Sequence, residues 1–214
     1  MARRVFTVAR QMASGGDQVA ADLARFFDIP LLERQILEAA AAAAGVSTET
    51  ISEVEKVPSF LERMLEYLGQ HSGGLDPLGN FSMEQPASLT MTTDSYRHLI
   101  EKVLRQTAQE SDAVIVAHGG AVVLHDLPYV FKVFVCAPLE LRVQRLQEAE
   151  HISIAEAQRR IREDDKMRID YFHTYYKVDW LSPSVYDLCI NTARIDTATA
   201  VDLIKEAHAK VVQD

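Results

Sequence analysis

The fold is decided by the stretch Val5-Phe6-Thr7-Val8-Ala9-Arg10-Gln11-Met12-Ala13-Ser14-Gly15-Gly16-Asp17-Gln18. Its apolar beginning, residues 5–9, is typical of a buried β-strand. Small residues follow, and residues 17–27 then place apolar side chains along one face of a helix. A strand that turns through small residues into a helix can hold an anion, because backbone N–H groups and the helix N-terminus both attract negative charge. The stretch therefore predicts an α/β fold with an anion site after its first strand.

The loop in this stretch departs from the common phosphate-loop pattern, Gly-x-x-x-x-Gly-Lys-[Ser/Thr]. Gly15 matches the second glycine, whereas Arg10, Gly16 and Asp17 replace the first glycine, the lysine and the hydroxyl residue. An ordinary strand-to-helix turn, with Asp17 in the first helical turn, is therefore an alternative. If the loop does bind phosphate, the predicted binding residues are Arg10, Ser14, Gly15, Gly16, Asp17 and Gln18.

Apolar strands alternate with helices along the rest of the chain. Further strands are expected over residues 29–32, 113–117, 130–135 and 187–190, and helices over residues 33–44, 94–109, 153–176 and 197–212, with another that begins at Pro138. Near-continuous apolar strands separated by helices indicate a parallel sheet covered on both faces. Ligands of such sheets bind at the carboxyl ends of the strands, so the segments just after each strand are the places to look for chemistry.

One domain, residues 1–214, is expected from the length of the chain. Within it, residues 33–92 carry helical patterns and are predicted to form a helical insert. The last part of this insert, residues 71–92, is rich in glycine, proline, serine and threonine, which predicts a flexible loop.

Composition and charge limit the classes of partner. The 214 residues are 48% hydrophobic, which allows a full core, and carry a formal net charge of −9. An acidic surface argues against nucleic acid, because its backbone demands a basic patch, but a few convergent cations suffice for a small phosphorylated ligand. The sequence shows no signal peptide and no apolar run of ~18 residues, so a cytoplasmic protein without a membrane partner is expected. Cys136 and Cys189 lie in apolar runs and are predicted to be buried.

Two segments gather cations in this acidic chain. Arg142 and Arg145 share a helix face shortly after the strand at residues 130–135. The helix at residues 153–176 adds Arg162, Lys166 and Arg168 within about two turns. Such groups neutralise the charge on a transferring phosphoryl group, and a mobile lid often carries them. The alternative for both segments is a solvated face whose cations pair with nearby carboxylates.

Five motifs in the chain are similar to those of one family. Residues 9–16 correspond to S-R-E-x-G-S-G-G, and residues 29–36 to I-P-x-x-D-[KR]-x-[IL]. Residues 137–142 match A-P-L-E-x-R, residues 165–176 match D-K-x-R-x-x-Y-x-x-Y-Y with one extra residue, and residues 186–192 match Y-D-L-C-I-N-[ST]. Over nearly its whole length, the chain therefore resembles the cytidylate-kinase-like family.

The resemblance implies a P-loop-kinase-like fold: a five-stranded parallel sheet flanked by helices, with a helical acceptor region at about residues 33–92 and an Arg-rich lid at about residues 153–176. It implies transfer of the γ-phosphoryl group of ATP to a nucleoside monophosphate such as CMP, with ATP and Mg²⁺ as cofactors. In this scheme Glu33 and Arg34 line the acceptor side. The candidates for neutralising the transferred group are Arg142, Arg162, Lys166 and Arg168.

The sequence also differs from the family at positions where chemistry is expected. The charge of Asp17 opposes phosphate, and residues 117–121 read A-H-G-G-A where relatives have V-G-R-G-A, so an arginine is lost. No carboxylate ends the second long strand to hold Mg²⁺, and we assign no residue to a metal. Two alternatives to an active enzyme follow: a nucleotide-binding or regulatory module that has lost catalysis, and a non-enzymatic scaffold. Whether the chain forms a homodimer is left open.

Overall fold

The structure is a computed structural model that describes residues 3–44 and 93–211. Five parallel strands form one sheet in the order β2-β3-β1-β4-β5. The strands are β1 (Val5–Arg10), β2 (Leu31–Leu32), β3 (Ala113–Val116), β4 (Val130–Cys136) and β5 (Leu188–Asn191). The predicted parallel five-stranded sheet is confirmed, and the part of the predicted insert at residues 45–92 lies outside the described residues.

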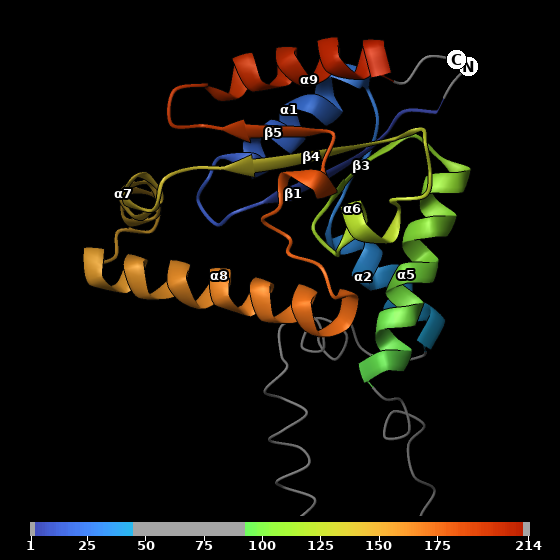
Figure 1. Cartoon of the computed structure of the whole chain (residues 1–214), viewed down its shortest axis with the longest axis horizontal. Helices are drawn as coiled ribbons and strands as arrows, with labels where there is room; N and C mark the ends of the chain where they lie inside the picture. Colours follow the sequence, from blue (N-terminus) through green and yellow to red (C-terminus); the bar gives the residue numbers. More distant parts are fainter. Residues whose placement is uncertain (1–2, 45–92, 212–214) are drawn as a thin grey trace, which may run out of the picture.

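Helices cover both faces of the sheet (Figure 1). Helices α1 and α9 lie on one face, and α2, α5, α6 and α8 lie on the other. Their bounds are α1 (Gly16–Phe27), α2 (Arg34–Ala44), α5 (Thr93–Glu110), α6 (Gly120–Val123), α7 (Leu139–Glu150), α8 (Ile154–Tyr176) and α9 (Thr197–Val211).

Strand β1 is the centre of the sheet and of the core. It pairs with β3 on one side and with β4 on the other, and its first four residues are buried. Because side chains alternate along a strand, Val5 packs toward α2 and α5 while Phe6 and Val8 pack toward α1 and α9. Thr7 therefore faces the same side as Val5, which is the side that α8 covers.

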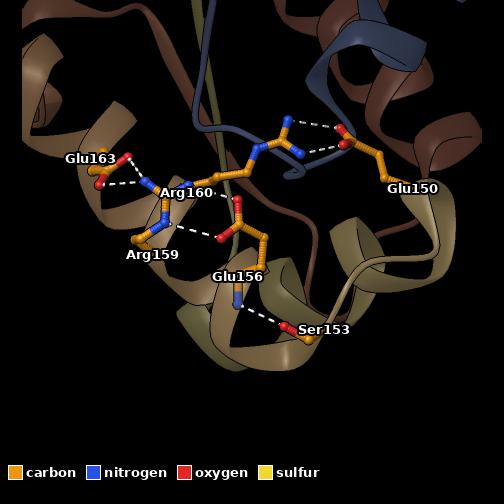
Figure 2. Close-up of polar contacts among 6 residues, drawn as sticks. All are labelled: Glu150, Ser153, Glu156, Arg159, Arg160 and Glu163. Carbon is orange, nitrogen blue, oxygen red and sulfur yellow. Dashed lines mark hydrogen bonds and ion pairs between the residues drawn. The ribbon is translucent and has the colours of Figure 1, made fainter.

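Helix α8 begins where the sequence predicts. Ser153 is its N-cap, and the Ser153 Oγ accepts a hydrogen bond from the backbone N–H of Glu156 at 3.2 Å (Figure 2). Ala157 and Ile161 are fully buried against Val143 and Leu146 of α7. This contact fixes α8 across the carboxyl end of the sheet.

The prediction that both cysteines are buried is wrong for Cys189, which is exposed, whereas Cys136 is half-buried. Cys189 lies on β5, an edge strand, where only one of four residues is fully buried. An apolar run does not reveal that its strand is at the edge. Within the described ranges, no helix is long and apolar enough to cross a bilayer.

Candidate active site

A cavity of about 640 Å³ lies at the carboxyl ends of β1 and β3. Its lining comes from β1, the start of α2, the segment 117–122, the pocket side of α8 and the connection that follows α8. This is the end of a parallel sheet where ligands bind. Glu33 and Arg34, the predicted acceptor residues, both line the cavity, as do Arg10 and Arg168.

The predicted anion loop, residues 11–15, joins β1 to α1. Ala13 and Gly15 have left-handed backbones, with φ of 58° and 85°, and the N–H of Ser14 donates to the carbonyl of Gln11 at 3.1 Å. Ser14 is completely buried, and its Oγ has no hydrogen-bond partner among the described residues. A buried hydroxyl without a partner is costly, which makes Ser14 a candidate to contact a bound anion.

Arg145 fixes the backbone of this loop from outside. Its guanidinium donates to the Ser14 carbonyl at 3.1 Å, to Thr192 Oγ1 at 2.9 Å and to the Thr192 carbonyl at 3.0 Å. Thr192 Oγ1 also donates to the Ser14 carbonyl at 2.6 Å. The sequence places Arg145 near the ligand edge but does not reveal this supporting role, because its partners are distant in the chain.

Arg10 and Gly16 fit against each other in space. A Cβ on Gly16 would lie under 3.0 Å from the Cβ of Arg10, so the side chain of Arg10 passes directly over this glycine. The Arg10 guanidinium then reaches the carboxylates of Asp17 and Glu33, each at 2.6 Å. The two unusual residues of the loop are therefore complementary, and the arginine joins the loop to Glu33, which lies just before α2. The predicted phosphate ligand Gln18 points its amide along α1, where it donates to the carboxylate of Asp22 at 2.8 Å.

Of the three cations predicted to act from the lid, Arg168 lines the cavity. It makes a forked pair with Asp164 at 2.8 and 3.2 Å, and its guanidinium lies 5.8 Å from the centre of the Trp180 ring. Arg162 and Lys166, the other lid candidates, are exposed and are not among the lining residues. The structure thus brings only one of the three lid cations to the cavity.

Arg142 lies away from the cavity, between α7 and α8. It is 4% exposed and makes a forked pair with Asp165 at 2.7 and 3.0 Å. This contact attaches α8 to α7, because the two residues belong to different helices. A catalytic role for Arg142 stays a prediction, and its observed contact is structural.

An ion-pair network covers the first half of α8 (Figure 2). Arg159 pairs with Glu156 at 2.7 Å and with Glu163 at 2.8 Å, and Arg160 pairs with Glu150 at the end of α7. The guanidinium of Arg159 lowers the pKa of the Glu156 carboxyl. This part of α8 therefore fits the alternative of a solvated, ion-paired face, although Arg160 also lines the cavity.

The segment after β3 is strained. Ala117, His118 and Gly119 have consecutive left-handed backbones, with φ of 66°, 53° and 70°. Non-glycine residues in this region cost about 1–3 kcal/mol each. His118 Nε2 lies 2.7 Å from the carbonyl oxygen of Glu33, which joins this segment to the start of α2. Strain of this kind beside a cavity is typical of functional sites.

Comparisons with known proteins agree with this arrangement. A family model described as the cytidylate kinase-like family matches residues 5–194. The chain belongs to the cytidylate kinase-like family. The predicted kinase-like α/β fold is thereby confirmed.

Cytidylate kinases are among the relatives of this family member. That of Methanopyrus kandleri is 31% identical over 116 residues, which cover 50% of this chain and 60% of the relative. That of Desulfurococcus amylolyticus is 28% identical over 152 residues, which cover 70% of this chain and 76% of the relative. An uncharacterized protein from Eubacterium ventriosum shares the fold, with a TM-score of 0.67, 21% identity and coverage of 95% of this chain and 97% of that one.

Proposed function

We propose that this protein is a nucleotide kinase-like phosphotransferase that moves the γ-phosphoryl group of ATP to a nucleoside monophosphate such as CMP. The observation that carries the proposal is the cavity at the carboxyl end of the sheet, whose lining includes Arg10 and Met12 from the segment that follows β1 and Arg168 from α8, whereas Ser14, Gly15, Gly16 and Asp17 are not part of the lining. An oxygen of the acceptor phosphate would attack the γ-phosphorus, the bond to the bridging oxygen of ADP would break, and ADP would leave. The cytoplasm is the compartment that this reaction implies.

The residues of the loop fit a phosphate better than they fit Mg²⁺. Ser14 offers a buried hydroxyl with no partner among the described residues, and the loop precedes the N-terminus of α1. The nearest carboxylates, Asp17 and Glu33, are both occupied by Arg10. No cluster of three or more metal-binding side chains occurs in the described ranges.

During transfer, charge spreads over the oxygens of the moving phosphoryl group. Arg168 lines the cavity and would neutralise part of this charge, while Asp164 holds its guanidinium in place through two hydrogen bonds. Glu33 and Arg34 would contact the acceptor from the start of α2. Arg162 and Lys166 would contribute only after a movement of α8, because both lie outside the lining.

One observation favours a second candidate, a nucleotide-binding module without catalysis. The loop lacks its lysine, and both carboxylates that contact Arg10 would compete with phosphate for that cation. Calorimetric titration with ATP and CMP, with and without Mg²⁺, combined with direct detection of CDP, separates the candidates. ATP binding without any product across the nucleoside monophosphates would favour the module, and no nucleotide binding would leave a scaffold.

A further inference from the structure

Thr7 is a polar residue at the centre of the sheet, on the wall of the cavity. Only 1% of its surface is exposed, and its Oγ1 has no hydrogen-bond partner among the described residues. Its methyl group packs close to Gly120, since a Cβ on that glycine would lie 3.1 Å from Thr7 Cγ2. Burying a hydroxyl without a partner costs free energy, and native proteins rarely retain such groups without a use.

Trp180 presents a second unpaired group in the same cavity. It is also 1% exposed, and its indole Nε1 finds no acceptor in the described part of the chain. The ring is held firmly between two aromatic side chains. It stacks on Phe172, with 5.9 Å between the ring centres, and makes an edge contact with Phe134, with 5.4 Å between the ring centres. Tyr186 donates its hydroxyl hydrogen to the Trp180 carbonyl at 2.6 Å, and burial raises the pKa of that phenol, so it stays a donor.

The arginines that line the cavity, unlike Thr7 and Trp180, already have hydrogen-bond partners. Each of the four arginines in the described lining already has a carboxylate partner: Arg10 pairs with Glu33, Arg34 with Glu38, Arg160 with Glu150 and Arg168 with Asp164. The polar groups that lack partners are neutral. The unmet hydrogen-bonding capacity of the cavity wall therefore suits an uncharged part of a ligand.

We propose that Thr7 and Trp180 bind an uncharged hydrogen-bonding group of the acceptor substrate, which in a nucleoside monophosphate is the base or the ribose. This inference rests on the proposed function. The indole N–H can only donate, so the ligand offers it a carbonyl oxygen, a hydroxyl oxygen or a ring nitrogen. The hydroxyl of Thr7 can donate or accept, so it forms a hydrogen bond with an adjacent polar atom of the same ligand. The two residues then select the acceptor, while ATP occupies the loop.

Thr7→Val is the decisive variant, because it replaces the hydroxyl by a methyl group of nearly the same size. We expect the dissociation constant for CMP, measured by calorimetry, to rise about three- to tenfold, which corresponds to one lost hydrogen bond. The dissociation constant for ATP should not change. Without ligand, the urea midpoint of Thr7→Val should equal or exceed that of the wild type, since the buried hydroxyl is no longer left unpaired. Thr7→Ser, which keeps the hydroxyl, is the matched control and should bind CMP like the wild type.

CMP binding and the fluorescence of Trp180 together test the role of Thr7 and Trp180 separately from the kinase activity. Trp180 is the only tryptophan of the chain, so a shift of its emission when CMP is added reports directly on the cavity. Wild-type binding of CMP with no change in Thr7→Val, or with no change in the emission of Trp180, would overturn the inference and leave the kinase proposal intact. Failure of the wild type to bind any nucleoside monophosphate would overturn both. Weaker ATP binding in Thr7→Val, with CMP binding unaffected, would place the ligand of Thr7 on the donor side and contradict the inference.

Discussion

Gly16→Lys would restore the lysine of the common phosphate-loop pattern, yet we expect it to disrupt the loop. A Cβ at residue 16 would lie under 3.0 Å from Arg10 Cβ, 3.0 Å from Arg10 Cγ and 3.2 Å from Val135 Cβ. Relaxed carbon contacts are ~3.5–4.0 Å. The Cβ atoms of Arg10 and Val135 are fixed by the pairing of β1 with β4, so the backbone of the loop must move.

The change in the free energy of unfolding is the difference between a cost of overpacking and a gain from replacing glycine in a helix. Overpacking in a tight site costs ~1–3 kcal/mol, whereas replacing a helical glycine regains up to ~1 kcal/mol. We therefore expect Gly16→Lys to lower the free energy of unfolding by about 1–2 kcal/mol. Urea unfolding followed by circular dichroism measures this change.

The same geometry predicts a rescue. Arg10→Gly removes the Cβ and Cγ that meet residue 16, and combined with Gly16→Lys it supplies the first glycine and the lysine of the common pattern. We expect the double variant to be more stable than the sum of the single effects implies, with a coupling of about 1 kcal/mol. Additive effects, within ~0.5 kcal/mol, would refute the reasoning.

Gly15→Ala is the matched control in the same loop. The nearest atom to its added Cβ would be Thr197 Cγ2 at 3.7 Å, so there is space for a methyl group. The φ of 85° alone should cost ~1–2 kcal/mol. This cost should not depend on whether residue 10 is arginine or glycine.

Substitutions at three further residues test the charges of the molecule. Arg168→Ala should lower turnover by about 10²-fold or more, with partial rescue in Arg168→Lys, because only a guanidinium makes the forked contact; equal steady-state rates would contradict this. Asp17→Asn removes a negative charge beside the loop and leaves Arg10 paired with Glu33 alone, so calorimetry should show ATP binding tightened by about two- to fivefold; unchanged or weaker binding would count against a phosphate site there. Burial, together with the charge of Arg4, lowers the pKa of His208 below its ordinary value of 6.5. The unfolded chain then binds this proton more readily, so the stability should be complete above about pH 6.5 and decline as the pH falls below it. Urea midpoints at pH 7.5 and 5.5 measure the decline, and His208→Gln should remove its histidine component.

Much of the fold could be predicted because it is encoded locally. The apolar run at residues 5–9 and the small residues that follow gave the central strand and the loop within one residue of their observed limits. The helix predicted over residues 153–176 likewise agrees with the limits of α8 to within one residue. Such signals depend on neighbours in the sequence, which a pattern of residues records directly.

The site could be predicted only in part, because its contacts are long-range. The sequence showed Arg162, Lys166 and Arg168 on one helix but not that Arg168 lines the cavity while the other two do not. It gave no sign that Thr7 and Trp180 meet the same cavity, since a threonine in a strand and a tryptophan in a connection are ordinary in isolation. Trp180 lines the cavity because its ring packs against Phe134 of β4 and Phe172 of α8, residues that are distant from Thr7 in the sequence.

The attachment of Ser14 by Thr192 has a consequence for the synthesis of the protein. The two residues are 178 positions apart in the chain, yet the carbonyl of one accepts a hydrogen bond from the side chain of the other. Domains form as units while the chain grows from its N-terminus, so the anion loop leaves the ribosome long before the residue that secures it. A chain that stops before β5 can form the strand and helix on either side of the loop, but it lacks Thr192 and one of the anchors of Arg145. The segment from β5 onward thus supplies contacts that fix the loop after β1, and chains that end before β5 should bind nucleotide more weakly than the finished protein.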